Sequence, residues 1–490
     1  MFQKRILVSI ILIFLSTVFA HGQKQNLTLS QVLDRAQSNS LDAFIQKNMY
    51  LSQQWEYKAY VADRLPNLSL AVTPFNYNRS FTQRYNSITD KDEYREQQSM
   101  YSYTRMSLSQ NIGLTGGTIY VDSDLGRLES YGEGSSKSYS STPVRVGLSQ
   151  PLFGFNEFKW QSKLEPLKFE KAKKEYILNL QNVNVTAVGL FFDQVLAQLN
   201  VEMDSSNQIN AFALYEMGKK RFKIAAIKQN ELLNLELNVL KAKTNLAKSL
   251  KELQQTRFNL NVFLDFNENE LKHLILPDDV PKLIVDVTNA LELALKNHPL
   301  LMEEQQNEWE ADMQVDKARK ARHFQANLVA SYGLNQQSET FYNAYQNPLN
   351  QQKVQMSLEI PILDWGKRKG NYKMAQSDRE VIRLSSKQKQ IDFKQEVSRK
   401  VIDFNLQGEL VYNAQRADEI ARKSYQVTLE LFKEGKASVL QLDDALNKQD
   451  QSKEEYITSL KNYWEYYYTI QMLTFYDFRS GKALKAELGI

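Results

Sequence analysis

The sequence predicts an α+β protein in which short amphipathic strands lead into very long helices, and in which this plan occurs twice. Residues 146–160 (VGLSQPLFGFNEFKW) and 356–370 (MSLEIPILDWGKRKG) each pass from a strand-like alternation, through proline and glycine, into a long charged helical pattern. Glycine (18) and proline (10) are scarce in 490 residues, and both break helices, so long uninterrupted helices are expected. Landmarks of the first half also recur in the second at fixed offsets.

The N-terminus predicts a signal peptide over residues 1–22. Lys4 and Arg5 precede a largely apolar 14-residue run, and small residues near Ala20 and Gly22 follow as the cleavage zone. A retained membrane anchor is the alternative, but a membrane span needs about 20 apolar residues. The signal predicts an exported chain, and no later segment has the apolar length of a helical span.

Composition argues against several function classes. Removal of residues 1–20 takes away Lys4 and Arg5, so the net charge falls from +4 to +2, which is no nucleic-acid signature. The absence of cysteine excludes disulfides, thiolate chemistry and a lipid-modified cysteine. The four histidines show no metal-ligand spacing, and no nucleophile–base pair or phosphate loop is present. We therefore expect no enzyme activity, no cofactor and no metal.

An internal repeat predicts the domain organisation. Near the start of each half the matches share an offset of 258: Leu29 with Val287, Ala36 with Ala294, Asn39 with Asn297, Arg64 with Arg322. Further along the offset is 210: Pro151 with Pro361, Asp193 with Asp403, Phe222 with Phe432, Leu232 with Leu442. The offsets differ by 48, which places an insertion among the strands of the first half. The predicted parts are a signal peptide (1–22), a first repeat (23–265), a linker (266–286), a second repeat (287–478) and a C-terminal tail (479–490).

Each half is expected to run from a helix through strands into a long helix, a turn and a return helix. The first helix spans roughly 28–62 and is capped by Thr28 or Ser30. Alternation of apolar and polar residues predicts strands at 67–72, 144–149, 326–332 and 353–360. The insertion holds two more strand-like runs, 100–110 and 117–124. They either extend the sheet to six strands per copy or form an extracellular hairpin, and we favour the hairpin.

The long helices are expected to pack as coiled coils. Between Asn156 and Phe222 the only proline is Pro166, so this segment would reach on the order of 100 Å. The return segment carries apolar residues seven apart, the spacing of a coiled-coil seam: Leu232, Val239, Leu246, Leu253 and Leu260.

The strands need a partner layer. Four strands with one apolar face cannot close a sheet, so the face must meet lipid or another layer. At an outer membrane only a closed barrel satisfies every backbone group, so several copies must contribute strands. A water-soluble sandwich is the alternative, and the strands alone leave both open. The long helices favour the barrel because they have no globular core and can continue it as a tube. Pro151 and Pro361 then mark the passage from barrel to helix.

The sequence resembles the TolC-like outer-membrane efflux proteins over nearly the whole mature chain. The resemblance rests on LSQPLFG and LEIPILDWGK, on LTLSQVLDRAQSNS and VTNALELALKNHP, and on LFKEGKASVLQLDDAL. It implies a homotrimer whose barrel, with four strands per chain, continues into a helical tunnel in the periplasm. It further implies a channel that exports small molecules or polypeptides together with a periplasmic adaptor (membrane-fusion) protein and an inner-membrane transporter, without enzymatic activity.

The resemblance also suggests site residues. The distal helix turns would contact the adaptor, through Lys223 and Ala225 in the first half and Gly435 and Lys436 in the second; plain exposed turns are the alternative. Gly435 suits a tight reversal because glycine accepts positive φ. Ala225 replaces that glycine, which predicts a looser turn or another geometry.

In well-known members of the family, two acidic residues one helical turn apart form a ring at the narrowest opening of the channel. The corresponding positions in this sequence are Gln441 and Asp444, so the first of the two acids is missing. Asp443 should point elsewhere, because neighbours on a helix diverge by about 100°. Asp444 is therefore the candidate residue for the pore constriction, and the alternative is that it is simply a solvent-exposed acid on the helix face. The tyrosine and arginine of the family's latch correspond to Phe432 and Ala437, so the latch is not transferred.

Aromatic residues suggest a membrane belt. Tyr101, Tyr103 and Tyr120 lie in strand-like runs and are the belt candidates. Tyr466, Tyr467 and Tyr468 fall on a helix and are expected to pack between helices. An adhesive coiled-coil stalk with a small β-head remains the alternative function, and a periplasmic adaptor is a third.

Overall fold

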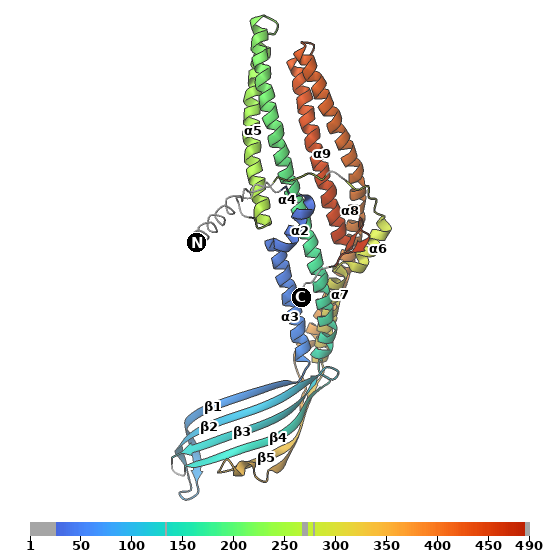
Figure 1. Ribbon diagram of the computed structural model, residues 1–490. Helices are drawn as coiled ribbons and strands as arrows, with labels where there is room; N and C mark the ends of the chain where they lie inside the picture. The colour runs from blue at the N-terminus through green and yellow to red at the C-terminus, as the bar shows by residue number, and fades with distance from the viewer. Residues whose placement is uncertain (1–25, 133–134, 267–272, 278–279, 486–490) are drawn as a thin grey trace, which may run out of the picture. The chain divides into compact units, whose positions relative to one another are not determined.

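The computed structural model describes residues 26–132, 135–266, 273–277 and 280–485 (Figure 1). The predicted signal peptide lies outside these residues. The chain divides into two compact units. One comprises the described residues within 52–171 and 300–389 and holds the large β-sheet. The other is helical and comprises the described residues within 26–51, 172–299 and 390–485.

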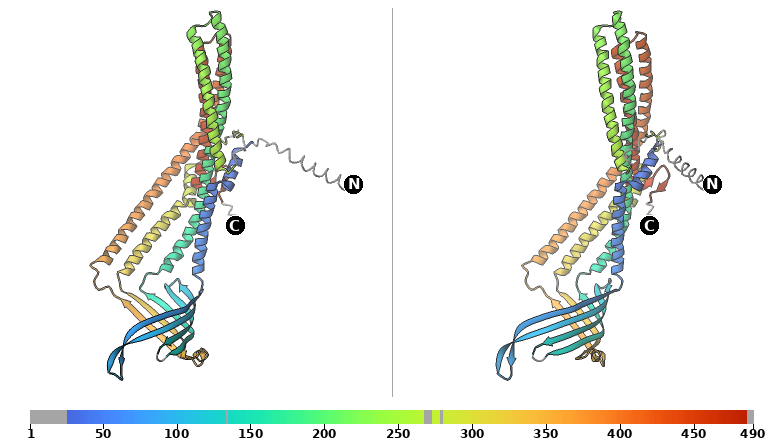
Figure 2. Two further views of the ribbon diagram at one scale, coloured as in Figure 1. Left: turned by 90° about the vertical axis from the view of Figure 1, so that its left-hand side faces the viewer. Right: turned by 60° about the vertical axis from the view of Figure 1, so that its left-hand side comes forward.

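A six-stranded antiparallel sheet dominates the first unit (Figure 2). Its strands follow one another in chain order: β1 (Asn67–Asn86), β2 (Lys91–Ile112), β3 (Gly117–Tyr131), β4 (Ser136–Leu152), β5 (Gln325–Ser338) and β6 (Leu349–Glu359). Among the residues that the structure describes, neither edge strand, β1 or β6, has a second partner strand, so the sheet of one chain is open.

The inserted segment belongs to this sheet. The four predicted strands are β1, β4, β5 and β6. The runs at 100–110 and 117–124 are β2 and β3, which pair with each other and with β1 and β4. The favoured expectation of four strands and an extracellular hairpin is therefore wrong. The insertion extends the sheet because β2 also pairs along its length with β1, and β3 with β4.

The two faces of the sheet differ in polarity. One row of aligned residues, one from each of the first five strands, is apolar: Leu68, Leu108, Val121, Val146 and Tyr332. The neighbouring row, on the opposite face, is polar: Ser69, Ser107, Asp122, Arg145 and Gly333. Leu68 is 63% exposed, so within one chain the apolar face stays uncovered at this edge.

Prolines in the sheet lie where they disturb pairing least. Pro74 lies within the register shift between Thr73 and Asn76. Pro143 lies at a shift of β4 against both of its neighbours. Proline has no N–H to donate, so a bulge is where a strand accommodates it.

The strand-to-helix junctions are short and capped. Pro151 pairs with Asn327 at the end of β4, and α4 begins at Glu157. There Asn156 Oδ1 accepts a hydrogen bond from the backbone N of Lys159 at 3.1 Å. Pro361 follows β6, and Asp364 accepts from the backbone N of Arg368 at 3.2 Å as α8 begins. Both prolines thus lie between a strand and a long helix.

The helices of the two halves match in order and length. The first half has α2 (Leu29–Asn39), α3 (Leu41–Asp63), α4 (Glu157–Lys223) and α5 (Gln229–Phe263). The second has α6 (Val287–Asn297), α7 (Leu300–Ala321), α8 (Lys367–Lys433) and α9 (Val439–Thr474). Both α4 and α8 have 67 residues, and both α2 and α6 have 11. The single helix expected over 28–62 is in fact two, separated at Ser40.

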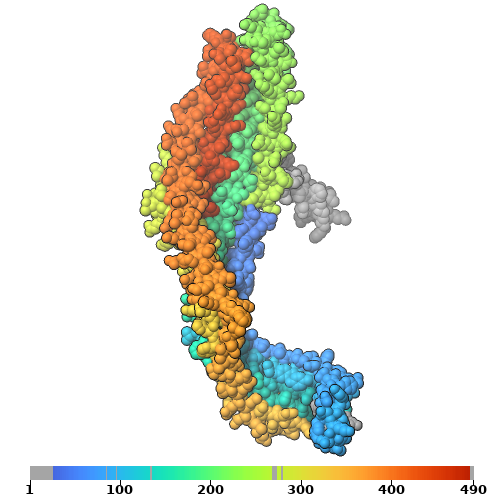
Figure 3. All heavy atoms as spheres, turned by 180° about the vertical axis from the view of Figure 1, so that it is seen from behind, coloured from blue at the N-terminus to red at the C-terminus, as the bar shows by residue number. Residues whose placement is uncertain are grey.

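The helical unit is built from two hairpins, α4 with α5 and α8 with α9. In the space-filling view α9 lies against the first hairpin (Figure 3). Of the predicted seam residues in α5, Leu260 is buried, and Leu232, Val239, Leu246 and Leu253 are half-buried. A second line with the same spacing, Leu235, Ala242 and Ser249, is buried beside them. Tyr467 is buried, and its ring lies 6.3 Å from that of Phe404 in α8, as expected for packing between helices.

Candidate functional site

The two distal turns of the helical hairpins share one backbone geometry. Ala225 and Gly435 both adopt positive φ, 51° and 79°. The N of Ala226 donates to the carbonyl of Arg221 at 2.9 Å, and the N of Lys436 to that of Leu431 at 2.8 Å. This is the pattern of a Schellman C-cap. The expectation of a looser or different turn at Ala225 is therefore wrong: alanine takes the left-handed conformation, at a cost of about 1–2 kcal/mol.

Each return helix then begins with a cap. The side chain of Gln441 accepts from the backbone N of Ser438 at 2.8 Å, while Ser438 Oγ accepts from the N of Gln441 at 3.3 Å. In the first hairpin Glu231 accepts from the backbone N of Lys228 at 2.9 Å. Gln441 therefore caps the start of α9, and this capping role explains why an amide is found at this position.

The two neighbouring acids of α9 point in different directions, as predicted. Asp444 is exposed and pairs with Lys448 Nζ at 2.6 Å. Asp443 is half-buried and accepts a hydrogen bond from Asn238 of α5 at 3.1 Å. Only Asp444 is thus free to face solvent, and its role at a constriction stays a prediction.

An arginine that sequence reasoning missed joins the two hairpins. Arg221, at the end of α4, donates to the carbonyl oxygens of Phe432 at 3.2 Å and Lys433 at 2.8 Å. Its guanidinium lies 5.3 Å from the ring of Phe432, which is 4% exposed and packs with Tyr425 and Leu442. Cations near the C-terminus of a helix satisfy its last carbonyls. The helix that Arg221 caps is α8, whose bonded carbonyls lie 211 and 212 residues further along the chain, so no local signal reveals the contact.

A protonatable link lies further along the same pair of hairpins. Asp450 of α9 accepts a hydrogen bond from Asn207 of α4 at 2.9 Å. Burial is the main cause that raises the pKa of Asp450 to about 6; the nearby carboxylates of Asp204 and Glu454 also raise it, while the hydrogen bond from Asn207 opposes the rise. This contact therefore changes its charge in mildly acidic solution.

The polar face of the sheet carries an ion-pair network. Arg145 Nη2 lies 2.9 Å from Asp122 and 3.3 Å from Asp124, and Arg105 reaches Asp124 at 3.9 Å. Ser107 Oγ donates to Asp122 at 2.6 Å. Two acids and two bases balance, so this part of the face is polar without being strongly charged.

The predicted belt tyrosines lie on this polar face. Tyr120 shares its side of β3 with Asp122, and Tyr101 and Tyr103 share the side of β2 that bears Arg105. The structure therefore does not place them on the apolar face, which is the face that would bear a membrane belt. The reason is local packing: a Cβ on Gly147 would lie 2.2 Å from the Tyr120 ring, so the ring covers the glycine.

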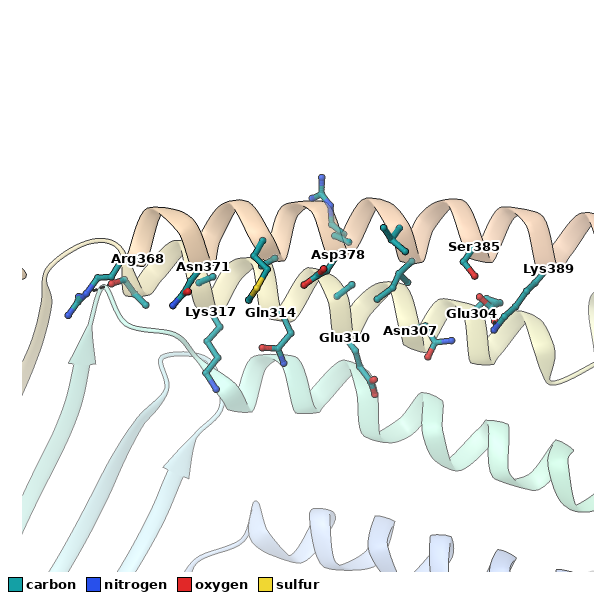
Figure 4. A pocket seen from close by; sticks show the side chains of 18 residues that line it. Glu304, Asn307, Glu310, Gln314, Lys317, Arg368, Asn371, Asp378, Ser385 and Lys389 are labelled. Carbon is teal, nitrogen blue, oxygen red and sulfur yellow. Dashed lines mark hydrogen bonds and ion pairs between the residues drawn. The ribbon is translucent and has the colours of Figure 1, made fainter. Parts of the chain in front are cut away.

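A groove of about 840 Å³ lies between α7 and α8 (Figure 4). Ion pairs bridge it, from Lys389 to Glu304 at 2.7 Å and from Arg379 to Asp312 at 3.6 Å. The side chain of Arg368 closes one end by donating to the carbonyl of Ala321 at 2.8 Å. These contacts hold α7 against α8 along the groove.

Among the residues that the structure describes, no helix combines the length and the apolar character that crossing a membrane requires. Nor do these residues hold three or more His, Asp or Glu side chains grouped to bind a metal.

The comparisons with known proteins agree with this architecture. The family described as outer membrane efflux protein matches residues 290–469. A membrane protein from Pseudomonas aeruginosa is 12% identical, covers 91% of this chain and 90% of its own, and has a TM-score of 0.65. The outer membrane protein VceC from Vibrio cholerae is 11% identical, covers 91% and 95%, and scores 0.63.

The Campylobacter jejuni CmeC outer membrane channel is 14% identical, covers 94% of this chain and 87% of its own, and scores 0.63. Curated protein sequences gave no match. The resemblance stated from the sequence is thereby confirmed, and at these identities the solved structures establish the shared fold.

Proposed function

We propose that this chain, a TolC-like outer-membrane efflux protein by its family match and fold, forms a homotrimeric channel. The channel exports small molecules or polypeptides across the outer membrane. A periplasmic adaptor protein and an inner-membrane transporter complete the pathway. One observation carries the proposal: a six-stranded sheet with one uncovered apolar face, one polar face and two unpaired edges.

Such a sheet is incomplete by itself. Its edges carry unpaired backbone groups, and its apolar face needs a non-aqueous surface. Pairing of β1 in one copy with β6 in the next satisfies the edges and closes a barrel. The apolar face then meets lipid, and the polar face, with Asp122 and Arg145, lines an aqueous lumen.

The strand number makes this barrel wider than the four-stranded plan implies. Three copies of six strands give 18. Because barrel diameter grows roughly in proportion to strand number, the barrel is about one and a half times as wide as one with four strands per copy.

Uncovered apolar stripes support assembly of the helical part. On α5, Leu233, Leu237 and Leu240 are exposed at a spacing that places them on one face. On α8, Ile402, Leu406 and Leu410 are exposed at the same kind of spacing. Neighbouring copies in a coiled-coil tunnel would cover both stripes.

The remaining assignments follow from the same arrangement. Helices of equal or nearly equal length in the same order support an internal duplication, with repeats at 23–265 and 287–478. The adaptor would contact the distal turns, at Lys223, Ala225, Gly435 and Lys436. In a threefold assembly Asp444 would form a ring of three carboxylates, each paired with Lys448 of its own copy, and carboxylate rings favour cations.

The proposal is tested on the full chain expressed with its N-terminal segment in a Gram-negative host. We expect heat-resistant trimers in the outer-membrane fraction and discrete conductance steps in planar bilayers. A water-soluble monomer would refute the channel. Protease treatment of whole cells separates it from an adhesive stalk, because a stalk projects outward and is cleaved, whereas a tunnel projects inward.

A further inference from the structure

We infer that the α4–α5 turn, and not the α8–α9 turn, is the electrostatic docking surface, and that it binds an acidic segment of a protein partner. This inference rests on the proposed function, in which a periplasmic adaptor contacts the distal turns. The inference specifies that the partner's contacting segment is acidic, and it distinguishes by charge two turns that have the same backbone geometry.

The two turns present side chains on equal scaffolds. Their cap hydrogen bonds and their positive-φ residues correspond at an offset of 210. The helices that follow begin with the same extended backbone, φ −85° at Lys228 and −84° at Ser438. Corresponding positions therefore point alike, and any difference in recognition comes from the side chains.

Those side chains differ in charge. Residues 216–234 contain five bases and two acids, whereas the corresponding residues 426–444 contain two bases and four acids. At matched positions Lys220 becomes Glu430, and the exposed Ile224 becomes Glu434. One scaffold thus presents a basic surface with an apolar tip in the first hairpin and an acidic sequence in the second.

Ion pairing increases the contrast. In the second turn the carboxylates have lysine partners, since Glu430 pairs with Lys433 at 2.7 Å and Glu434 with Lys436 at 2.7 Å. The pair of Asp444 with Lys448 described above adds a third. The acidic sequence is therefore largely neutralised within its own hairpin.

The first turn retains free charge. Its acids are engaged, because Glu216 pairs with Lys219 at 2.7 Å and Glu231 caps the helix. Within the described parts of the chain, the exposed Lys220, Lys223 and Lys228 form no ion pair. Three exposed ammonium groups around an apolar tip are complementary to a partner segment that carries carboxylates.

The test uses synthetic helical-hairpin peptides as probes, identical except for four Glu, four Gln or four Lys residues at the tip. Binding to the full-length trimer in detergent is measured by fluorescence anisotropy. We expect the Glu-tip probe to bind at least about fivefold more tightly than the Gln-tip probe, and this preference to weaken with salt. The double variant Lys220→Glu/Lys228→Glu should lose about tenfold in affinity for the Glu-tip probe.

A matched control changes the same number of charges on the second hairpin. Lys433→Glu/Lys448→Glu should change the affinity for the Glu-tip probe by less than about twofold. Equal losses in both double variants, or no preference for the Glu-tip over the Gln-tip probe, would overturn the inference. Equally tight binding to phosphatidylglycerol vesicles would also overturn it, because the surface would then recognise any anionic layer.

The conductance of the same samples separates this inference from the proposed function. Wild-type protein that binds the Glu-tip probe but forms no pore refutes the channel and leaves the charge assignment standing. Pores that conduct normally in protein without any probe preference refute only the charge assignment.

Discussion

The shared turn geometry predicts opposite effects of two reciprocal substitutions. Ala225 carries a side chain in the left-handed conformation, where an L-residue costs about 1–2 kcal/mol. Glycine removes that cost but adds freedom to the unfolded chain, worth about 0.5–1 kcal/mol. Ala225→Gly should therefore stabilise its turn by about 0.5–1 kcal/mol.

The reciprocal substitution, Gly435→Ala, tests the cost of the left-handed backbone conformation by itself. A Cβ added at Gly435 meets nothing within 4 Å, so Gly435→Ala introduces strain without a clash. It should destabilise the second turn by the same amount, about 0.5–1 kcal/mol.

Hydrogen–deuterium exchange of peptides covering residues 221–228 and 431–438 measures both effects in one experiment. Local stability changes of this size alter exchange about two- to fivefold, slower in the Ala225→Gly turn and faster in the Gly435→Ala turn. Each variant's unmodified turn is the control. Faster exchange at residues 221–228 in Ala225→Gly would refute the left-handed assignment.

Three further predictions concern the sheet and the contacts between the two helical hairpins. Gly147→Ala should displace the Tyr120 ring and cost about 1–3 kcal/mol in urea unfolding of the folded protein; Tyr120→Ala should recover part of that cost, and an unchanged midpoint would contradict the packing. Arg221→Lys keeps the positive charge but loses the planar guanidinium that donates to the carbonyls of Phe432 and Lys433, so hydrogen–deuterium exchange at residues 431–436 should rise about fivefold. Exchange equal to that of the wild type would show that these two hydrogen bonds do not hold the end of α8. Burial raises the pKa of Asp450 from 3.8 to about 6, so its contribution to stability is complete below pH 3.8 and is lost as pH rises through 6. Asp450→Asn should remove this loss and stabilise the contact between α4 and α9 by about 1 kcal/mol at pH 7. Hydrogen–deuterium exchange measured from pH 4 to 7 tests this, and a variant that kept the wild-type pH dependence would contradict it.

Local patterns in the sequence predicted the element types well. The alternation around Val146 and Val354 gave strands, and the seven-residue spacing from Leu232 gave a coiled-coil helix. The break at Ser40 was missed, although its hydroxyl caps α3 by accepting from the N of Ala43 at 3.1 Å. Pro299 marks the corresponding break in the second half and would have signalled it.

Properties that depend on distant partners were not predictable from local patterns. The face that Tyr120 occupies is set by pairing with Gly147 across β3 and β4. The place of β2 and β3 within the sheet depends on their neighbours, because alternation fits a free hairpin equally well. Arg221 acts on a helix end that only the folded hairpins bring near it.

The central claim is that copies of this open sheet close into one membrane barrel. Cryo-electron microscopy of the full chain extracted from the outer membrane into lipid nanodiscs tests it most directly. The proposed assembly predicts a threefold ring with 18 strands, with β1 of each copy paired to β6 of the next and the Asp122–Arg145 pairs facing the lumen. A single copy with its apolar face folded inward, or a ring whose polar face meets the lipid, would contradict it.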